Sequence, residues 1–408
     1  MRNLKMTNKK LLFIWNYHYF PFEKGKSRFS DLLEAFVKEG YQVEVVTSSF
    51  YHMGKTQRLI GDPKYQSFGY KVHFIRELGY KKNVSLARVR SMNRFNVGVR
   101  TYLKKHDPVD VVYVPVPSIK LADIAEKWCR TTNAKCVIDV EDLWPESFQM
   151  IIKLKFFYKT LTWPLMIQAN RVYRKADAVV TVSQTYMNRV KNVRKGSFPS
   201  AVAPIGADLD YCSSISKAGS VIKPQGEFWI TYIGTLGKSY DLRMIIDGIN
   251  LISDRCKTKI VFKILGSGPD EEMLRLYVMG KKGKYEFLGL LPYDNMCQVL
   301  GCSDLAVNPI VGSSVASLIN KVADYAACGV PVINMQNCKE YIDALNLTQS
   351  GFTVPNGMTE LFSSCVEFLA ENPALLAFYR QNVPALASQY FSRTKSQKAI
   401  VSLLNSLK

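Results

Sequence analysis

The chain has 408 residues with 54 Lys and Arg against 34 Asp and Glu, which gives a formal net charge of +20. The hydrophobic fraction of 47% is ordinary for a globular protein, and the 22% charged fraction excludes a disordered polyelectrolyte. The charge is uneven, because residues 1–200 carry a net +19 and residues 201–408 only +1. We therefore expect the first half to face an anionic partner.

The N-terminus is basic and then apolar, as in a signal peptide, but the apolar stretch 11–15 is short and leads into Asn16, Tyr17 and His18. We interpret it as a first β-strand. The sequence contains no run of about 18 uncharged apolar residues, so it predicts no transmembrane helix. The nine cysteines include no C-x-x-C pair, which indicates buried thiols in a reducing cytoplasm and neither a disulfide framework nor a zinc site.

Short apolar runs alternate with helical patterns along the chain, which is typical of parallel βαβ units. In the first half we predict helices at 28–39 and 120–131, and a polar seam follows at about 200–226. In the second half we predict helices at 242–252, 270–279 and 320–328, with a helical C-terminal part at 359–369 and 373–407. The predicted strands are 10–15, 42–47, 71–75, 109–114, 135–139 and 178–182 in the first half, and 229–233, 259–265, 284–288, 305–308 and 330–334 in the second.

This pattern predicts two Rossmann-like domains with parallel sheets that face a central cleft, with ligands bound beyond the carboxyl ends of the strands. We set the boundaries at residues 1–200 for an N-terminal domain and 201–390 for a C-terminal domain. Residues 391–408 are expected to form a helix that returns to the N-terminal domain.

Two glycine motifs follow strands of the second half. In the first, Gly234 and Gly237 allow close approach of the backbone to a ligand, and Lys238 offers a positive charge, as in a phosphate cradle. A tight turn with a solvated lysine is the alternative. In the second, Gly266 and Gly268 precede a proline and three acids, which are also ordinary helix-start signals.

A serine-rich loop then leads into a helix at 320–328. Lys321 lies in the first turn, where a cation opposes the helix dipole unless an anion lies near the free amides of Ser317 to Asn320. Asp324 lies one turn later and suits a sugar hydroxyl. The alternative is an amphipathic helix whose polar face happens to carry both residues.

The first half offers an acidic cluster and an aromatic loop. Asp139, Glu141, Asp142 and Glu146 lie within eight residues at a strand end, which predicts a base, a hydroxyl ligand or a cation ligand. A metal-binding D-x-D interpretation of this cluster, or of Asp208-Leu-Asp210, is the alternative, although the latter looks like a linker turn. The loop 16–28 combines aromatic residues, a glycine and cations.

Taken in order, these motifs resemble the GT-B glycosyltransferases, in particular retaining family 4 enzymes that build bacterial capsule, O-antigen and exopolysaccharide. The resemblance covers essentially the whole chain. The matching segments are 23–28, Asp-Leu-Trp-Pro-Glu at 142–146, 176–183, Pro-Ile-Gly-Ala-Asp at 204–208, Tyr-Ile-Gly-Thr-Leu-Gly at 232–237, Gly-Ser-Gly-Pro at 266–269, 287–293 and 318–332.

The resemblance implies that the second half binds a nucleotide-diphosphate sugar, with a UDP-sugar favoured. Lys238 and Lys321 would neutralise the diphosphate without a metal or other cofactor, and Asp324 would hold a ribose hydroxyl. The remaining donor-binding residues would be Gly234, Thr235, Gly237, Gly266, Gly268, Leu288, Ser317, Leu318, Ile319 and Asn320. The first half would bind the acceptor through Gly25, Arg28, Glu141 and Trp144, with Asp142 as a catalytic residue.

The sequence departs from the family pattern at several positions. The usual pair of glutamates is Ala316 and Asp324, the usual arginine after the first glycine is Thr235, and the usual proline before the Asn-Lys pair is Ile319. These departures keep two alternatives open. One is a nucleotide-sugar 2-epimerase of the same fold, and the other is an inactive scaffold of a polysaccharide assembly complex.

The basic excess concentrates in segments 81–105 and 151–175, where cations are interleaved with apolar residues. Such amphipathic stretches suit an anionic bilayer surface, with a packed helix as the alternative. No nucleic-acid-binding motif is present. The sequence therefore predicts a cytoplasmic glycosyltransferase, peripherally attached to the inner face of the cell membrane, that acts on a lipid-linked saccharide.

Overall fold

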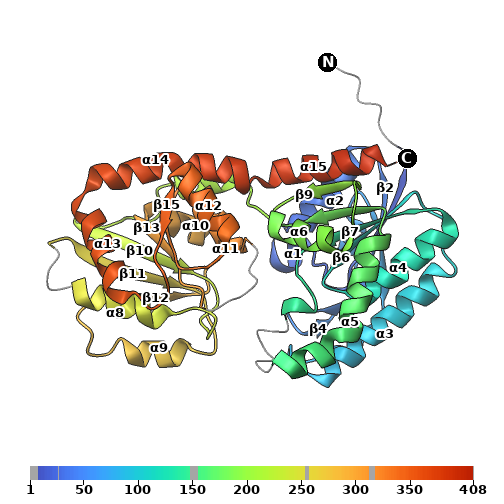
Figure 1. The fold of residues 1–408 in the computed structure, drawn as a ribbon, viewed down its shortest axis with the longest axis horizontal. Coiled ribbons are helices and arrows are strands. Elements are labelled where there is room, and N and C mark those ends of the chain that lie inside the picture. The colour runs from blue at the N-terminus through green and yellow to red at the C-terminus, as the bar shows by residue number, and fades with distance from the viewer. Residues whose placement is uncertain (1–7, 26, 148–154, 253–256, 312–317, 408) are drawn as a thin grey trace, which may run out of the picture. The chain divides into compact units, whose positions relative to one another are not determined.

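The computed structural model describes residues 8–25, 27–147, 155–252, 257–311 and 318–407. The chain divides into two compact units, which we call unit 1 (Met1–Ala203 with Lys395–Lys408) and unit 2 (Pro204–Thr394). Each unit is built on one parallel sheet flanked by helices (Figure 1). The α/β class that was predicted from the alternating pattern is therefore confirmed.

The sheet of unit 1 has seven parallel strands in the order β5-β2-β1-β6-β7-β8-β9. The strand order reverses between β1 and β6, so a crevice is expected beyond the carboxyl ends of these two strands. The six predicted strands are present with small shifts of their ends, and β9 is an addition. The strands are β1 (Lys10–Ile14), β2 (Gln42–Ser48), β5 (Lys71–Ile75), β6 (Val111–Val116), β7 (Lys135–Val140), β8 (Ala178–Thr181) and β9 (Ser200–Val202).

The helices of unit 1 cover this sheet. The second of them begins because the Ser27 hydroxyl accepts a hydrogen bond from the Ser30 amide at 3.0 Å. The helices are α1 (Pro21–Lys24), α2 (Arg28–Lys38), α3 (Leu86–Leu103), α4 (Ile119–Thr132), α5 (Lys155–Lys175), α6 (Gln184–Val193) and α15 (Arg393–Ser406). A small hairpin, β3 (Phe50–Tyr51) with β4 (Thr56–Gln57), lies beyond β2.

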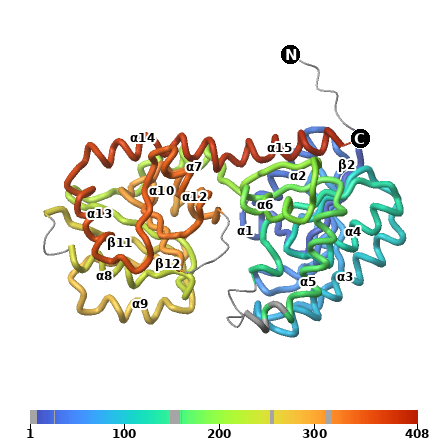
Figure 2. The backbone as a smooth tube through the Cα atoms, viewed as in Figure 1, coloured from blue at the N-terminus to red at the C-terminus, as the bar shows by residue number. Residues whose placement is uncertain are grey.

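The C-terminal helix α15 packs on unit 1, as Figure 2 shows where the red end of the tube reaches blue segments. Ile400 and Leu404 join the buried cluster of Phe13 and Phe36. The Leu407 carbonyl also accepts a hydrogen bond from Lys9 Nζ at 2.8 Å. The chain therefore closes the core of unit 1 with residues from both of its ends.

The sheet of unit 2 has six parallel strands in the order β12-β11-β10-β13-β14-β15, with the reversal between β10 and β13. Its strands are β10 (Glu227–Ile233), β11 (Lys259–Leu265), β12 (Lys284–Gly289), β13 (Leu305–Asn308), β14 (Val332–Asn334) and β15 (Gly351–Thr353). Its helices are α7 (Leu209–Ser216), α8 (Leu242–Ile252), α9 (Glu271–Tyr277), α10 (Tyr293–Cys302), α11 (Asn320–Ala327), α12 (Lys339–Thr348), α13 (Thr359–Glu371) and α14 (Pro373–Tyr390).

Three features of unit 2 differ from the prediction. The seam holds helix α7, because Asp208 caps it by accepting a hydrogen bond from the Tyr211 amide at 3.1 Å. The predicted helical stretch 373–407 is two helices, broken where Ala207 pairs with the backbone on both sides of Ser392. Helices α10 and α12 and strand β15 were not predicted.

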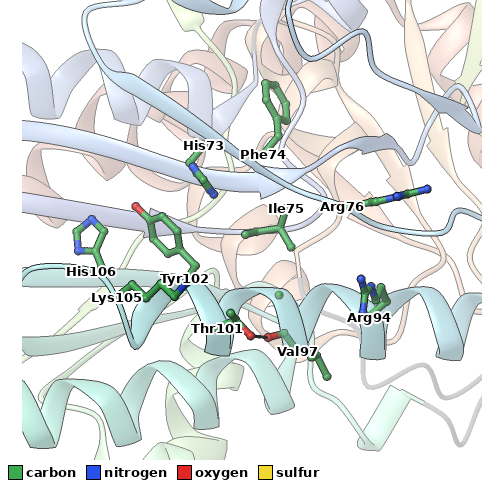
Figure 3. A pocket seen from close by; sticks show the side chains of 11 residues that line it. His73, Phe74, Ile75, Arg76, Arg94, Val97, Thr101, Tyr102, Lys105 and His106 are labelled. Atoms are coloured by element: carbon green, nitrogen blue, oxygen red, sulfur yellow. Dashed lines mark hydrogen bonds between the residues drawn. The ribbon is translucent and has the colours of Figure 1, made fainter.

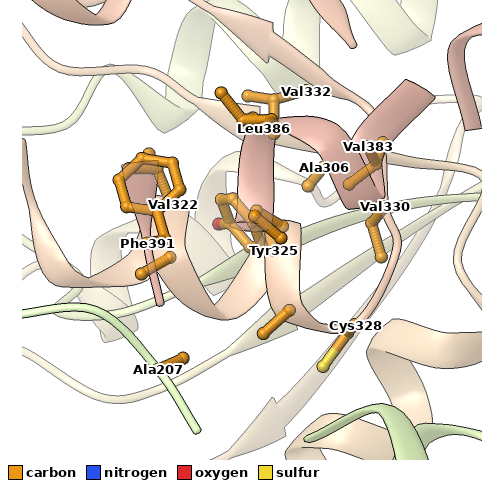
Figure 4. Close-up of a cluster of buried hydrophobic side chains, with 14 of the residues drawn as sticks. Ala207, Ala306, Val322, Tyr325, Cys328, Val330, Val332, Val383, Leu386 and Phe391 are labelled. Atoms are coloured by element: carbon orange, nitrogen blue, oxygen red, sulfur yellow. The ribbon is translucent and has the colours of Figure 1, made fainter. Parts of the chain in front are cut away.

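Helix α11 is fixed at the strand-order reversal by its buried face. Val322 and Tyr325 lie in a cluster with Leu386 and Phe391 (Figure 4). The Tyr325 hydroxyl accepts from the Ile233 amide at 3.0 Å and donates to the Val307 carbonyl at 3.2 Å, which joins α11 to both β10 and β13. The polar residues of α11 are therefore held rigidly at the carboxyl ends of these strands.

Two further findings bear on the environment of the chain. The eight cysteines that the structure describes are free thiols, and six of them are buried. Within the described residues no single helix is long and apolar enough to cross a bilayer. Helices α13 and α14 meet that criterion only together, across a bend of 98°.

Candidate functional site

The candidate site of unit 2 centres on the ammonium group of Lys321. This side chain is only 9% exposed, and its Nζ has no hydrogen-bond partner among the described residues. It lies 3.6 Å from the ring centroid of Tyr240 and 4.1 Å from that of Tyr232. Burial lowers the pKa of Lys321 well below its usual value. A buried and unpaired cation is unfavourable, so its position favours binding of an anion.

Gly234 makes room for this lysine. It adopts φ of +133°, and a Cβ at this position would lie 2.7 Å from Lys321 Nζ. The adjoining turn is closed by the Tyr232 hydroxyl, which donates to the Thr235 carbonyl at 2.7 Å. The glycine predicted from the motif is therefore required by the lysine predicted from the helix, 87 positions along the chain.

The glycines of the second motif are required because its loop packs tightly against the loop of the first motif. A Cβ on Gly266 would lie 1.9 Å from the Gly234 carbonyl oxygen, and one on Gly268 would lie 2.1 Å from the Leu236 carbonyl oxygen. The Leu236 amide donates to the Ser267 carbonyl at 3.0 Å. The two loops thus support each other at the carboxyl ends of β10 and β11.

Gly237 differs from these glycines, because a Cβ there would meet nothing closer than 3.7 Å. With Lys238 it lines a hollow of about 490 Å³ that also includes Tyr240, Asp241 and Arg243. Lys238 and Thr235 are exposed. This hollow shares Tyr240 with the Lys321 site and offers two further cations to a ligand.

Asp324 lies one turn beyond Lys321 and accepts a hydrogen bond from the Tyr293 hydroxyl at 2.8 Å. Burial raises the pKa of Asp324 to about 7, opposed by that hydrogen bond. Cys212 contacts the same hydroxyl at 3.2 Å. The carboxyl group is therefore positioned by a tyrosine and changes its charge near neutral pH.

The other residues predicted to bind the donor are distributed around α11 and β12. Leu318 is buried, Ile319 precedes the first turn of α11, and Asn320 is exposed in that turn. Leu288 is half-buried in β12. Ser317 lies outside the described residues.

The acidic cluster of unit 1 is organised by Arg28. This arginine, 5% exposed, lies 3.0 Å from a carboxylate oxygen of Asp139 and 3.2 Å from one of Glu141. The Tyr113 hydroxyl donates to Asp139 at 2.5 Å. Burial raises the pKa of Glu141 to about 8, with Arg28 opposing the shift and Asp139 adding to it. Glu141 is thus able to hold or release a proton near neutral pH.

The remaining residues predicted for acceptor binding lie close to this cluster in the sequence. Asp142 accepts a hydrogen bond from the indole nitrogen of Trp144 at 3.0 Å, and burial raises the pKa of Asp142. Gly25 is exposed with φ of +90°, and its amide donates to the Pro21 carbonyl at 2.7 Å. The structure therefore joins Arg28 to Glu141, and Asp142 to Trp144.

Tyrosines are the main residues that sequence reasoning missed. Tyr232, Tyr240 and Tyr293 each contact a predicted site residue, and Tyr113 contacts Asp139. Tyr232 and Tyr240 lie on either side of the glycine motif in the sequence. An aromatic residue at each end of a phosphate-type loop could therefore have indicated these two tyrosines as site residues. Tyr113 in the middle of an apolar strand carried no such signal.

Two observations concern other parts of the described chain. No three His, Cys, Asp or Glu side chains within it lie close enough together to hold a metal ion. A second hollow of about 420 Å³ lies between β5 and α3, lined by His73, Arg76, Arg94, Lys105 and their neighbours (Figure 3). None of the predicted site residues line it.

Comparison with known proteins gives a consistent result. Residues 227–372 match the family model described as glycosyl transferases group 1. The structure of the Anabaena protein HepE in complex with UDP superposes on this chain with a TM-score of 0.69 at 16% sequence identity. The superposition covers 98% of this chain and 100% of the HepE chain. A search of curated sequences finds no significant match.

Two other solved structures are similar over nearly their whole length. Sucrose-phosphate synthase from Thermosynechococcus elongatus has a TM-score of 0.70 at 14% identity and covers 98% of both chains. WaaG, a glycosyltransferase involved in lipopolysaccharide biosynthesis, has a TM-score of 0.65 at 13% identity, covering 96% of this chain and 99% of its own. The chain therefore has the GT-B fold, and the match to the glycosyl transferases group 1 model lies within unit 2.

Proposed function

We propose that the chain transfers a sugar from a nucleotide-diphosphate sugar, with UDP-sugars favoured, to a hydroxyl group of a lipid-linked saccharide. The group 1 domain at residues 227–372 and the GT-B fold support the reaction class. HepE, the similar structure described above, has also been solved with UDP-glucose, which supports the choice of donor. The product would be a bacterial surface polysaccharide unit such as capsule or O-antigen.

The buried ammonium group of Lys321 is the observation that carries this proposal. An unpaired cation held between two tyrosine rings, at the carboxyl ends of β10 and β13, is suited to the diphosphate of the donor. The first-turn amides of α11 and the exposed Lys238 add to the positive potential. The bond from the anomeric carbon to the phosphate oxygen breaks with its electron pair on the oxygen, and these groups stabilise the charge that develops there. The acceptor hydroxyl oxygen forms the new bond to the anomeric carbon, and its proton passes to the departing diphosphate.

The other residues have supporting roles in this proposal. Asp324 holds a ribose hydroxyl, the backbone at Leu288 contacts the base, and the loops at Gly234 and Gly266 lie against the donor. Unit 1 binds the acceptor, with Glu141, Asp142 and Trp144 in contact with its sugars. The proposal includes retention of anomeric configuration and no metal ion, because cationic side chains supply the stabilisation of the leaving group.

The test is nucleotide binding and turnover by the purified full-length chain. We expect UDP to bind with release of measurable heat, and a UDP-sugar to be consumed faster when an acceptor saccharide-lipid is added. The proposal fails if neither UDP nor another nucleoside diphosphate binds, which is the outcome that a scaffold predicts. Conversion of the donor to its 2-epimer without acceptor would instead identify the epimerase. The anomeric configuration of the product, read by NMR, decides retention.

Attachment to a membrane is part of the proposal, and helix α5 supports it. Its outer side chains Leu161, Trp163, Leu165 and Ile167 are between 40% and 69% exposed. The same helix ends in the exposed pair Arg174 and Lys175. Exposed apolar side chains on two sides of a helix that ends in exposed cations are suited to the interface of an anionic bilayer, which in this proposal is the cytoplasmic leaflet of the cell membrane.

Co-sedimentation with vesicles tests this attachment. We expect binding to vesicles that contain phosphatidylglycerol at low salt, weaker binding at high salt, and loss of most binding in a variant with Leu161→Gln and Trp163→Gln. Equal binding of wild type and variant, or no binding at low salt, would refute the role of α5. The control is a variant with Leu347→Gln, which alters a 77% exposed leucine of unit 2.

A further inference from the structure

The edge of the unit 1 sheet at β5 carries a hollow that neither candidate site uses. It has a volume of about 420 Å³, lies between β5 and α3, and is lined by 11 residues (Figure 3). Strand β5 is the last strand of its sheet, since it pairs with β2 on one side and with no described strand on the other. We call the hollow together with this open strand edge the edge groove.

The backbone of β5 is open along its outer edge. Its parallel pairing with β2 runs from Lys71 to Ile75, and the Ser49 amide extends this pairing with a hydrogen bond to the Ile75 carbonyl at 2.9 Å. Among the described residues, no other group forms a hydrogen bond with the backbone of 71–75. An open strand edge of this kind presents N–H and C=O groups to a further strand.

The α3 side of the edge groove is one face of the helix. Four of its lining residues recur at intervals of three or four, and these are Arg94, Val97, Thr101 and Lys105. At a rise of about 1.5 Å per residue, the stretch from the first to the last spans about 16 Å. The five residues of β5, at about 3.3 Å each, span about the same length. The groove is therefore long enough for an extended segment of about five residues.

The middle of the edge groove is apolar. Ile75 is buried and points from β5 toward α3 (Figure 3). A Cβ on Gly98 would lie 2.3 Å from Ile75 Cγ2, so the glycine lets the helix approach the strand closely here. Val97, also in the lining, is 53% exposed. These residues offer apolar surface without charge.

Cations lie at the two ends of the edge groove. Arg76 and Arg94 lie at one end and Lys105 at the other (Figure 3). All three are exposed, and none forms an ion pair with a carboxylate in the part of the chain that the structure describes. No acidic residue lines the groove. The planar guanidinium groups of the two arginines suit carboxylates in a bidentate geometry.

Glu44 of β2 leaves these cations unneutralised, because it has other partners. Its carboxylate accepts a hydrogen bond from the Tyr102 hydroxyl, and its other oxygen lies 3.2 Å from His106 Nε2. The Tyr102 ring also contacts the rings of His73 and His106, with centroid separations of 4.4 Å and 4.9 Å. This group of rings forms the end of the groove near Lys105 (Figure 3).

We propose that the edge groove binds an extended acidic peptide of another protein, which adds to β5 as a further strand of the unit 1 sheet. The backbone of the peptide pairs with the open edge of β5. An apolar side chain in its middle covers Ile75 and Val97. Acidic side chains two positions to either side meet Arg76 and Arg94 at one end and Lys105 at the other, because alternate residues of a strand face the same side.

Two other occupants match these features less well. A small anion would contact the cations and leave the strand edge unpaired. A second copy of this chain, paired through its own β5, would bring like charges together at the same edge. The inference is independent of the proposed function, since no residue assigned to the donor or the acceptor lines the groove.

The test uses the full-length chain and a fluorescein-labelled synthetic peptide, Ser-Glu-Thr-Val-Thr-Glu-Ser, in fluorescence anisotropy. Its two glutamates and its valine lie on one side of an extended strand, so they match the charged ends and the apolar middle of the groove. We expect saturable binding that weakens at high salt. A peptide of the same composition with the two glutamates adjacent should bind more weakly.

A charge variant of α3 tests the residues that line the groove. With Arg94→Gln and Lys105→Gln, the Kd for the peptide should rise about tenfold, as expected from the loss of two exposed ion pairs. The matched control is Arg90→Gln with Lys104→Gln, which removes the same charge from exposed positions on or next to α3 that do not line the groove. It should leave the Kd unchanged.

Hydrogen exchange tests the added strand itself. Bound peptide should slow amide exchange in residues 71–76 and leave exchange unchanged in β9, the strand at the other edge of the same sheet. A peptide with an N-methyl group on each of its five central backbone nitrogens keeps its charge and loses its hydrogen-bond donors, so it should not bind. The proposal is overturned if the parent peptide shows no saturable binding, or if the charge variant binds it as tightly as wild type. Equal binding of the N-methylated peptide, or unchanged exchange at 71–76, would also overturn it, because the contact would then be electrostatic only.

Discussion

The substitution Lys321→Met is the sharpest perturbation of the candidate donor site. It keeps an unbranched side chain of similar length between the rings of Tyr232 and Tyr240, and it removes only the positive charge. A net charge-assisted contact with the donor diphosphate is worth about 2–3 kcal/mol. Because about 1.4 kcal/mol corresponds to tenfold in affinity, the Kd for UDP is expected to rise about 30- to 150-fold.

The same substitution has the opposite effect on the stability of the free protein. The ammonium group is buried without a partner among the described residues, and burial lowers its pKa. Its contacts with two aromatic faces offset part of that cost, by about 1–2 kcal/mol each. We therefore expect Lys321→Met to leave the free energy of unfolding unchanged or to raise it by up to about 2 kcal/mol.

Lys263 provides a matched control within unit 2. It is also buried and lies 3.8 Å from the centroid of the Trp229 ring, but it forms an ion pair with Glu286. Lys263→Met removes one of the two ammonium groups that pair with Glu286, which keeps its ion pair with Lys284 at 2.9 Å. A loss of about 1–2 kcal/mol in stability and no change in UDP affinity are therefore expected. Titration calorimetry with UDP and denaturant unfolding measure both quantities. A destabilised Lys321→Met that binds UDP normally would refute the argument.

Three other perturbations have defined outcomes. Gly266→Ala should lower the free energy of unfolding by about 3 kcal/mol or prevent folding, because the added Cβ would lie 1.9 Å from a backbone oxygen. Gly237→Ala, whose Cβ would meet no such atom, should change the free energy of unfolding by less than about 0.5 kcal/mol, and denaturant unfolding measures both variants. The pKa of about 7 for Asp324 lies above its usual value near 3.8, so the folded state binds a proton between those values and wild-type stability falls as pH rises from 4 to 7. In thermal unfolding, Asp324→Asn should lack that fall, and an equal pH dependence in the two proteins would contradict the burial argument. Arg28→Met should destabilise by about 3 kcal/mol, because it removes the partner of two buried carboxylates, and a neutral effect in calorimetry would show that these carboxylates need no cation.

The sequence predicted the parts of the site that depend on local patterns. Gly234 follows an apolar strand, and Lys321 occupies the first turn of a helix, so each could be recognised within its own segment. Their contact could not be predicted, because it depends on the fold bringing residues 87 positions apart so close together that a Cβ on Gly234 would lie 2.7 Å from Lys321 Nζ. The same limit applies to Arg28 and Asp139, which pair across 111 positions.

The errors in the helices have two local causes and one long-range cause. Helix α12 has no capping side chain at Cys338 and ends at Gln349, which adopts a left-handed conformation without being glycine, so neither end carries the usual signal. Asp208 was a valid N-cap signal for α7 that we interpreted as part of a linker turn. The break at Ser392 depends on pairing with Ala207, which the sequence of the helix does not encode.

The tyrosines show why side-chain roles are harder to predict than elements. Tyr232 is an ordinary residue near the end of a strand and Tyr240 an ordinary residue after a turn, and both become important only because a buried lysine contacts their rings. Tyr293 likewise gains its role from the hydrogen bond to Asp324 on a different helix. Such roles follow from tertiary contacts and not from spacing.

A crystal structure of the chain with UDP tests whether Lys321 binds the donor diphosphate. We expect the diphosphate to lie against the N-terminus of α11, with a phosphate oxygen within hydrogen-bonding distance of Lys321 Nζ. Density for UDP elsewhere on the molecule, or a diphosphate out of reach of Lys321, would contradict it.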